Sequence, residues 1–273
     1  MNTPIFQSSD QLFTIYQGDC NDFLPQFENQ FDLIFADPPY FLSNNGLSIQ
    51  SGKIVSVNKG EWDKEENIDD IDAFNEQWIK NAKIALKDNG SILISGTYHN
   101  IFSLGRVLQK LNFKILNIIT WQKTNPPPNF SCRYLTHSSE QIIWARKSEK
   151  YPHFFNYELL KKINDNKQMR DIWTFPAIAP WEKKQGKHPT QKPLKLLVRL
   201  ILMASAENAL IADPFSGSAS TGIAANLLGR SFVGFEKESD FIKISIARKK
   251  ELDQNRLEFQ NKFEDLKLIH SFF

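Results

Sequence analysis

DLIFADPPY, at residues 32–40, is the most informative segment of this chain. The apolar run 33–36 has the length and composition of a buried strand, and Asp37-Pro38-Pro39-Tyr40 follows it directly. Proline has no backbone N–H to donate to a sheet, so two consecutive prolines predict that the chain leaves the sheet here. Open α/β sheets bind ligands outside the carboxyl ends of their strands. We therefore expect residues 37–40 to lie at a ligand site.

This tetrapeptide also predicts a kind of substrate. The Asp37 carboxylate and the Pro38 carbonyl can each accept one hydrogen bond from an exocyclic amino group, while Pro39 restricts the backbone. Tyr40 can stack on the ring that carries this amino group. The combination favours an aromatic amine. The alternative is a proline-rich turn with an incidental aspartate.

Short apolar, β-rich runs alternate with helical patterns along most of the chain. The expected strands are 13–17, 32–36, 91–95, 113–121, 140–145, 209–213 and 231–236, and the expected helices are 71–87, 100–110, 193–206, 217–228 and 238–263. This alternation predicts a largely parallel α/β sheet with helices on both faces. The runs 113–121 and 140–145 favour an antiparallel pair at one edge.

Two long stretches interrupt the alternation. Residues 41–70 are polar and rich in Gly, Ser and Asn, and a loop of that length is usually functional or mobile. Within it, Trp62 and Asp63 are candidates to close over a ligand, with core packing of Trp62 as the alternative. Residues 124–192 begin with TNPPPN and contain many basic and aromatic residues. We interpret them as an insertion or a small subdomain.

The composition is that of a globular protein. Of the 273 residues, 41% are hydrophobic and 23% are charged, which excludes disordered, collagen-like and coiled-coil chains. The N-terminus lacks the pattern of a signal peptide, and the most apolar stretch, 194–206, is too short and too charged to span a membrane. Cys20 and Cys132 are far apart in the sequence, which predicts neither a disulfide framework nor a metal site and favours the reducing cytoplasm.

Charge is unevenly distributed. Residues 121–200 contain fifteen Lys and Arg against six Asp and Glu, whereas the rest of the chain carries a net charge of −7. A basic middle between acidic flanks predicts a polyanionic partner for that segment. A solvated, lysine-rich surface is the alternative.

A second motif, DPFSGSASTG, occupies residues 213–222 between an expected strand and an expected helix. Small residues at such a turn let a ligand approach the backbone at a helix N-terminus. Glu236 ends the next expected strand, where a carboxylate can bind two ribose hydroxyls. Together they indicate a nucleoside cofactor, although a tight turn and a surface glutamate remain the alternative. Asp19 fits a helix N-cap better than an adenine contact, and KHPTQKP at 187–193 reads as a loop before a helix.

Together these segments resemble the amino-group DNA methyltransferases that use S-adenosylmethionine. DPPY resembles their catalytic motif and DPFSGSAST their cofactor loop, while KHPTQKP is similar to the segment that precedes this loop in one subgroup. The order of the motifs is that of the β class, and the resemblance covers about residues 12–250. The stretch 121–147, with FLSNNG and KGEWDK after DPPY, is most similar to small type II adenine methyltransferases that modify GATC.

The resemblance implies a Rossmann-like sheet of seven strands, mostly parallel with one antiparallel strand, in a circularly permuted order. It divides the chain into a catalytic half at 1–123, a target-recognition insertion at 124–187 and a cofactor-binding half at 188–273. The implied catalytic residues are Asp37, Pro38, Pro39 and Tyr40. The implied cofactor-binding residues are Asp19, Cys20, Asp37, His188, Thr190, Gln191, Lys192, Asp213, Phe215, Gly217, Ser218 and Glu236.

One departure concerns the cofactor loop. Family members often read DPFxGSGTT, whereas this chain has Ala219 and Ser220 in place of Gly and Thr. If residue 219 needs a positive φ, alanine strains the turn by about 1 kcal/mol or more. We expect cofactor binding to survive.

The implied reaction is methylation of adenine N6 in DNA, with the target base flipped out of the duplex and no metal required. Candidate contacts to DNA are Arg133, Arg146, Lys147, Lys161, Lys162 and Lys184, each with a solvated surface as the alternative. Methylation of cytosine N4, of RNA or of protein glutamine, and a non-catalytic DNA-binding relative, are the rival interpretations. The family makes a homodimer plausible, and the sequence leaves open both single-stranded DNA as a substrate and a cognate endonuclease.

Overall fold

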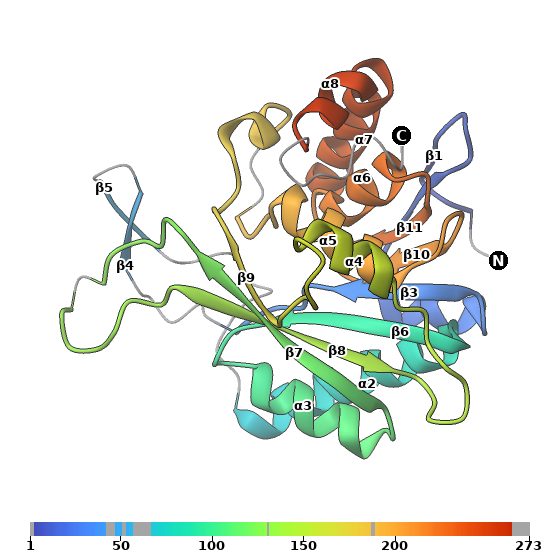
Figure 1. Ribbon diagram of the computed structural model, residues 1–273, viewed down its shortest axis with the longest axis horizontal. Coiled ribbons are helices and arrows are strands. Elements are labelled where there is room, and N and C mark those ends of the chain that lie inside the picture. The colour runs from blue at the N-terminus through green and yellow to red at the C-terminus, as the bar shows by residue number, and fades with distance from the viewer. Residues whose placement is uncertain are drawn as a thin grey trace.

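A nine-stranded sheet forms the centre of the molecule (Figure 1). The computed structural model describes residues 3–41, 47–50, 53–56, 67–129, 131–186 and 189–263. The strands of the sheet are β1 (Phe6–Gln7), β2 (Phe13–Gln17), β3 (Phe31–Ala36), β6 (Leu86–Gly96), β7 (Lys114–Lys123), β8 (Ser139–Arg146), β9 (Ile172–Phe175), β10 (Leu210–Asp213) and β11 (Ser231–Glu236). Their order is β1-β2-β11-β10-β3-β6-β8-β7-β9, and a separate hairpin joins β4 (Leu47–Gln50) to β5 (Lys53–Ser56).

The strand directions match the sheet implied by the resemblance. The pairs β2–β11, β11–β10, β10–β3 and β3–β6 are parallel. β8 is antiparallel to both of its neighbours, β6 and β7. In the order of the sheet, the seven strands β2-β11-β10-β3-β6-β8-β7 therefore form a mostly parallel sheet with one antiparallel strand. Two short strands extend it, β1 antiparallel to β2 and β9 parallel to β7.

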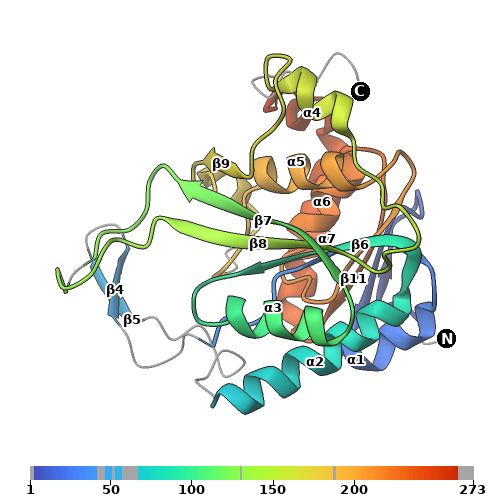
Figure 2. The ribbon, with the colours of Figure 1, turned by 60° about the horizontal axis from the view of Figure 1, so that its bottom comes forward.

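Helices cover both faces of the sheet, as Figures 1 and 2 show. On one face lie α1 (Cys20–Phe23), the 3-10 turn η1 (Leu24–Phe27), α2 (Ile68–Ala85) and α3 (Ile101–Lys110), which bury Trp78 and Leu104 against it. On the other face lie α4 (Tyr157–Ile163), α5 (Leu194–Ala204), α6 (Ser220–Leu227), α7 (Ser239–Gln254) and α8 (Arg256–Asn261), which bury Leu200, Ile223 and Leu252. A further 3-10 turn, η3 (Pro180–Lys183), precedes α5. The sheet is therefore buried on both sides, which explains the continuous apolar runs of its parallel strands.

The connections reverse direction between β3 and β10. From β3 the chain continues through α2 to β6, whereas from β10 it continues through α6 to β11, on the other side of the sheet order. Neighbouring strands with such opposite exits leave a crevice at their carboxyl ends, because their helices cover opposite faces. Asp37 follows β3 and Asp213 ends β10, so both motifs come to this crevice.

Three features differ from the sequence expectations. β9 was not expected, and it places β7 one strand in from the edge. β8 was expected as a strand and pairs with β7 as predicted, but with β9 it makes two strands of the central sheet part of residues 124–187. Within 41–70 the chain forms β4 and β5 and begins α2 at Ile68, while Trp62 and Asp63 lie outside the described residues. Among the described helices, none has the length and apolar character needed to cross a membrane.

Candidate active site

A cavity of about 250 Å³ opens at the carboxyl ends of the parallel strands. Its lining comes from the turns after β2, β3, β10 and β11, and from the segment before α5. The sequence-predicted residues that line it are Asp19, Cys20, Asp37, Pro39, Thr190, Gln191, Lys192, Asp213, Phe215, Gly217, Ser218 and Glu236. The fold thus brings together most of the predicted cofactor-binding set, while His188 lies outside the described residues.

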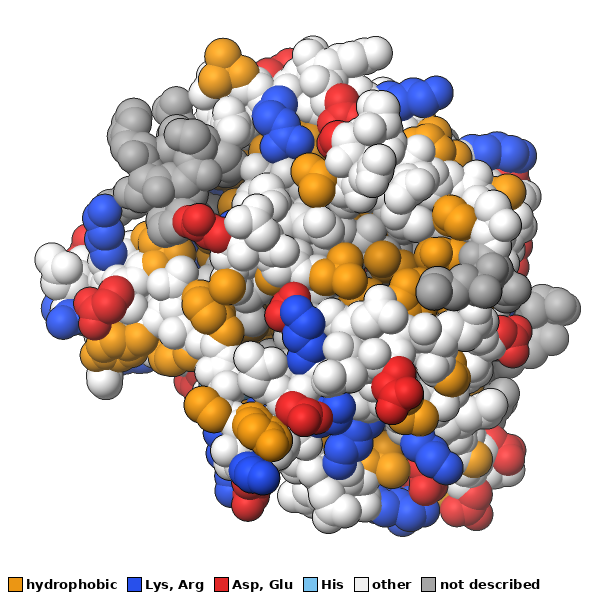
Figure 3. Space-filling model, turned by 90° about the vertical axis from the view of Figure 1, so that its right-hand side faces the viewer, with side chains coloured by type: hydrophobic (Ala, Val, Ile, Leu, Met, Phe, Trp, Pro, Cys, Tyr) orange, Lys and Arg blue, Asp and Glu red, His pale blue; other side chains and the backbone are white. Residues whose placement is uncertain are grey.

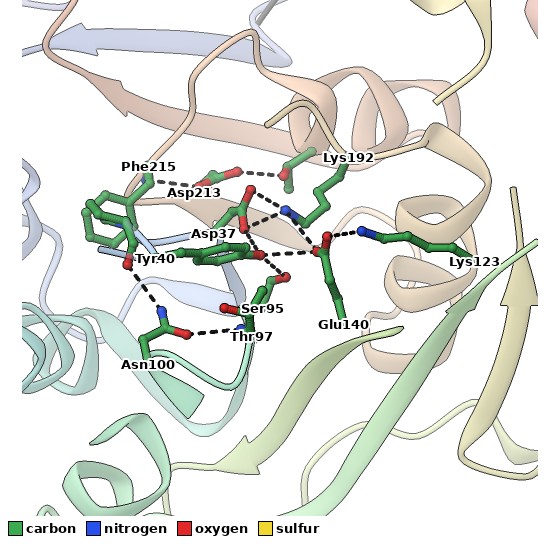
Figure 4. A network of polar contacts seen from close by, with 12 residues as sticks. Asp37, Tyr40, Ser95, Thr97, Asn100, Lys123, Glu140, Lys192, Asp213 and Phe215 are labelled. Atoms are coloured by element: carbon green, nitrogen blue, oxygen red, sulfur yellow. Dashed lines mark hydrogen bonds and ion pairs between the residues drawn. The ribbon is translucent and has the colours of Figure 1, made fainter. Parts of the chain in front are cut away.

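Asp37 forms an ion pair with Lys192 at the centre of the site (Figure 4). Lys192 Nζ donates to Asp37 Oδ1 at 2.7 Å and to Oδ2 at 2.6 Å, and its side chain is only 6% exposed. Burial alone would lower the pKa of this ammonium, but the carboxylates of Asp37 and Glu140 outweigh burial and raise the pKa above its ordinary value. Lys192 therefore stays charged at neutral pH and holds Asp37 in one orientation.

Tyr40 is buried with its hydroxyl pointing into the same network. The hydroxyl donates to Asp37 Oδ1 at 2.7 Å, and it lies 2.8 Å from Ser95 Oγ and 3.3 Å from Glu140 Oε2. Burial, followed by the negative charges of Asp37 and Glu140, raises the pKa of Tyr40 well above its ordinary value. The tyrosine is therefore a neutral donor whose ring position is fixed by its hydroxyl.

The turn after β6, the strand next to β3, holds the backbone of residues 37–40. Asn100 Nδ2 donates to the Pro39 carbonyl at 3.2 Å, and Asn100 Oδ1 accepts from the Thr97 N–H at 3.1 Å. Pro38 is buried and does not line the cavity, in contrast to Pro39. The turn after β6 thus sets the path of the loop after β3.

Glu140 is a second carboxylate of the site, with a side chain that is 13% exposed, and the sequence analysis missed it. Its Oε1 accepts from Lys123 Nζ at 2.6 Å, and its Oε2 lies 3.5 Å from Lys192 Nζ. Burial would raise the pKa of Glu140, but Lys192, Lys123 and the Tyr40 hydroxyl hold it at about 2. Glu140 is therefore ionised at neutral pH. Its position at the start of an expected strand gave no sign of this role.

Asp213 closes the turn that begins the cofactor loop. Its Oδ1 accepts from the Phe215 N–H at 3.0 Å and its Oδ2 from Thr221 Oγ1 at 2.6 Å. Burial raises the pKa of Asp213 to about 7 in spite of these two bonds, and the charges of Asp37 and Glu236 act in the same direction. The carboxylate ties the start of the loop to the first turn of α6.

The rest of the loop is fixed by a left-handed turn and a buried arginine. Ala219 has φ 54° and ψ 39°, in the left-handed region, as the comparison with the family's glycine anticipated. Arg248 Nη1, from α7, donates to the Ser218 carbonyl at 2.6 Å, to Ser218 Oγ at 3.0 Å and to Ser220 Oγ at 2.9 Å. The strained backbone is therefore held by a side chain on another helix.

Acidic groups line the opposite side of the cavity. Glu236 Oε2 accepts from the Gly217 N–H at 2.7 Å, and its Oε1 accepts from the Glu238 N–H at 2.8 Å. Asp19 caps α1 through the Asn21 N–H and pairs with Lys237 at 2.7 Å. Burial of Cys20 raises the pKa of its thiol far above the usual range, so this cysteine remains a neutral thiol.

Glu182 fixes the segment before α5. This buried carboxylate accepts from the Leu194 N–H at 2.8 Å and from the Ala179 N–H at 3.2 Å, and its backbone carbonyl accepts from Gln191 Nε2 at 3.0 Å. Burial raises the pKa of Glu182 above its ordinary value, although the two backbone N–H bonds oppose this. It holds the Leu194 backbone and the Gln191 side chain, on the two sides of Lys192.

The six predicted DNA contacts do not gather in one place. Arg146 is the last residue of β8, and the Lys147 ammonium is bonded to the Leu86 carbonyl at the start of β6 and paired with Asp88, so both lie at the end of the sheet away from the cavity. Lys161 and Lys162 lie on α4, whose preceding Asn156 N–H donates to Met203 at the far end of α5. Arg133 is exposed in the connection between β7 and β8, and Lys184 is exposed after η3.

Comparison with a family model decides the family. Residues 31–247 match the model described as DNA methylase, which is named for N6 and N4 methyltransferases. The chain belongs to the DNA methylase family. It is 60% identical over 250 residues to the type II methyltransferase M2.MboI of Moraxella bovis, covering 91% of this chain and 92% of that protein. It is 49% identical over 250 residues to the type II methyltransferase M2.DpnII of Streptococcus pneumoniae, with the same two coverages.

Solved structures support the same assignment. The crystal structure of the M1.HpyAVI–SAM complex aligns with a TM-score of 0.67 at 26% identity, over 86% of this chain and 98% of that one. The cytosine-N4-specific PvuII DNA methyltransferase aligns with a TM-score of 0.70 at 19% identity, over 99% of this chain and 96% of that one, which shows the shared fold alone. The resemblance inferred from the motifs is confirmed: the chain is a DNA methyltransferase, similar to type II enzymes, that uses S-adenosylmethionine.

The cavity fits this cofactor. Two buried polar atoms on its lining residues, Ser216 Oγ and Gln191 Oε1, have no hydrogen-bond partner within the described structure. A buried acceptor without a donor is costly, so these atoms indicate a polar ligand in the cavity. Glu236 and Asp19 offer carboxylate oxygens for hydroxyl and amino groups, and Phe215 and Phe235 provide apolar walls.

Proposed function

We propose that this methyltransferase transfers a methyl group from S-adenosylmethionine to the N6 amine of a flipped-out adenine in GATC, and so protects the site from a cognate restriction endonuclease. The observation that carries the proposal is the position of Asp37 at the carboxyl end of β3. There it lines the cavity and lies within one network with Lys192, Tyr40 and Glu140. The type II names of the two relatives favour the protective role.

The chemistry of adenine explains why an aspartate suits this position. The N6 lone pair is delocalised into the ring, so the amine is a weak nucleophile. In our proposal the Asp37 carboxylate and the Pro38 carbonyl each accept a hydrogen bond from one N–H of the amine, which localises the lone pair on nitrogen, and Asp37 accepts the one proton released after transfer. Tyr40 stacks on the flipped base. Cytosine-N4 enzymes usually have serine where this chain has Asp37, which favours adenine.

The cofactor supplies, when bound, a sulfonium methyl group with a neutral leaving group. We assign its ribose to Glu236, its adenine to Asp19 and Cys20, and its amino-acid end to Thr190, Gln191 and Lys192, with His188 as a further candidate. Asp213, Phe215, Gly217 and Ser218 form the wall of the methionine and ribose side. The role of these residues is to bind, orient and exclude water, because the reactivity lies in the methyl donor.

We place DNA on the side where the cavity opens. The β4–β5 hairpin and the connection between β7 and β8 project on this side in both Figures 1 and 2. Aromatic rings are exposed there: Tyr98 stacks on His137 with 4.7 Å between ring centroids, His137 lies 5.4 Å from Tyr134, and the two tyrosines are 54% and 60% exposed. Accessible rings beside a catalytic loop suit stacking on bases.

Arg133 neighbours this aromatic cluster and remains our main candidate for a guanine edge. Lys161, Lys162 and Lys184 remain candidates for phosphate contacts at longer range. The face seen in Figure 3, on the right-hand side of Figure 1, shows acidic and basic side chains interspersed, so it presents no field of a single sign. We propose further that the enzyme acts in the cytoplasm, in keeping with the unpaired thiols of Cys20 and Cys132.

The test is transfer of labelled methyl groups to duplexes that differ only in GATC, with Asp37→Ala as the negative variant and Glu149→Gln as a surface control. Label recovered as N6-methyladenine only from GATC duplexes, and lost in Asp37→Ala alone, supports the proposal. Label in another sequence, or on cytosine N4, contradicts the assignment of site or base. DNA binding without transfer contradicts catalysis. Single-stranded GATC and a sedimentation run decide strand preference and dimer formation.

A further inference from the structure

One ammonium serves two carboxylates in the active site. Lys192 Nζ has three N–H donors, of which two point to Asp37 at 2.7 and 2.6 Å. Glu140 Oε2 lies 3.5 Å from the same nitrogen. A charge-assisted bond of this type is usually about 2.8 Å long. Glu140 is therefore close enough to attract Lys192 and too far to hold it.

This arrangement conflicts with the task assigned to Asp37. With Tyr40 also donating to Oδ1, three donors of the protein already occupy the Asp37 carboxylate. The two oxygens of a carboxylate offer about four acceptor positions, so about one is left for a substrate amine, and a carboxylate neutralised by a bidentate ammonium accepts weakly. The amine therefore competes with these donors for Asp37, and Lys192 has a second acceptor, Glu140, beside it.

We propose that Glu140 is a positioning residue that takes over the Lys192 ammonium when the substrate amine binds to Asp37. The exchange moves hydrogen bonds only: Lys192 gives up one bond to Asp37, shortens its contact with Glu140, and remains protonated throughout. Asp37 thereby regains acceptor strength at the moment it is needed. This inference rests on the proposed role of Asp37 as acceptor for an amino group.

The surroundings of Glu140 suit a fixed acceptor. It stands at the start of β8, beside Gln141, which is paired with Gly96 across the sheet and with Thr120 of β7. Lys123 holds the other oxygen at 2.6 Å, so only Oε2 faces Lys192. The carboxylate is ionised at neutral pH, since its pKa is held at about 2. Glu140 therefore offers Lys192 a full negative charge at the pH of the reaction.

The path of Lys192 is also defined. Its ammonium lies 5.1 Å from the centre of the Tyr40 ring, and the ring's own hydroxyl points at both Asp37 and Glu140. At this distance the face of the ring attracts the ammonium in addition to the two carboxylates. The ammonium therefore stays paired while it changes partner.

The first test compares Glu140→Gln with wild type in single-turnover methylation and in steady state. Glutamine keeps the size of the side chain and removes the charge that draws Lys192 away from Asp37. We expect the transfer rate to fall about ten- to a hundredfold. This loss is smaller than the roughly 10²- to 10³-fold loss of kcat that follows when an enzyme loses a hydrogen-bond donor to the transition state. KM for DNA and the calorimetric Kd for the cofactor should stay within about twofold, because a loss confined to kcat marks an interaction used only in the reaction.

Two further variants separate this role from a merely structural one. Glu140→Asp restores the charge and should recover part of the rate. Lys123→Met removes the competing cation, so Glu140 attracts Lys192 more strongly and the single-turnover rate should rise. If the network were only structural, Glu140→Gln and Lys123→Met would both lose activity. Equal losses in these two variants, or a wild-type rate in Glu140→Gln, would overturn the proposal.

The control is Glu149→Gln, the same substitution at a side chain that is 72% exposed and pairs with Lys114 at 3.3 Å, and it should behave as wild type. All variants are assayed on whichever duplex the wild-type enzyme methylates. A failure of the GATC or adenine assignment then appears in the wild type, whereas a failure of the exchange appears only in the variants.

Discussion

Replacing Arg248 with methionine should weaken cofactor binding from a position outside the cavity. The guanidinium is buried, and its Nη1 makes three contacts with Ser218 and Ser220 in the cofactor loop. One nitrogen has two hydrogens, so these contacts amount to two charge-assisted bonds of about 1.5–3 kcal/mol each. Burial lowers the pKa of Arg248 from 12.5 to about 10, which corresponds to about 3 kcal/mol against the charged form.

Arg248 therefore contributes less to the unfolding free energy than the sum of its two hydrogen bonds, because burying its charge opposes folding. We expect Arg248→Met to lose about 2 kcal/mol of unfolding free energy, or about 4–6 °C in Tm for a chain of this size. The loop then has to be ordered by the ligand itself, and we expect Kd for S-adenosylmethionine to rise about tenfold, or about 1.4 kcal/mol. Differential scanning calorimetry and titration calorimetry measure the two effects.

Arg256→Met is the matched control. Arg256 Nη1 also donates to backbone carbonyls of this region, to Asn226 at 2.8 Å and Leu227 at 3.5 Å, but at the other end of α6 from the cofactor loop. It should lower Tm and leave the cofactor Kd unchanged. A wild-type Kd in Arg248→Met, or an equal loss of affinity in Arg256→Met, would refute the reasoning.

Four further outcomes follow from the structure. Gly222→Ala should lose about 1–3 kcal/mol in urea unfolding, because the new Cβ would lie 2.4 Å from a ring carbon of Phe232. Asp213 has a folded pKa of about 7 against 3.8 unfolded, so the folded state binds more protons, and between about pH 4 and 7 its contribution to unfolding free energy should fall by up to about 1.4 kcal/mol per pH unit. Asp213→Asn should flatten that dependence in urea titrations, and an unchanged slope would contradict the raised pKa. Tyr98→Ala should weaken DNA binding about 5- to 150-fold in fluorescence anisotropy, whereas Tyr98→Phe should not, if its ring stacks on a base. Ala219→Gly should change the unfolding free energy by less than about 1 kcal/mol. The substitution relieves the strain of the left-handed backbone, but it also removes a buried methyl group and makes the unfolded chain more flexible. A change above about 2 kcal/mol would show that these effects do not cancel.

Local sequence predicted the parts of the fold that local physics determines. The prolines after residue 36 ended β3 where expected, and the small residues after Asp213 formed the turn into α6. β9 was not predicted, because its four residues form a strand only by pairing with β7, about fifty positions away in the sequence. Pairing at that distance leaves no periodic signal in a stretch so short.

The site shows the same division. Asp37, Asp213 and Glu236 each end a strand or follow one, so their place could be inferred from the sequence. Glu140 could not, because its importance depends on which side chains another strand and a distant loop bring beside it. Arg146 shows the converse: it lies only six residues after Glu140, yet an antiparallel strand of that length carries it about 20 Å from the cavity.

The position of β8 limits how a new target specificity can be engineered or can evolve. A single cassette exchanged between residues 124 and 187 would replace a strand that is paired on both sides and would discard Glu140 with it. A chimaera that tests residues 124–187 as the target-recognition segment should therefore exchange them as two separate pieces, one on each side of residues 139–146. We expect chimaeras built at the outer boundaries to assemble less well than those that retain this strand.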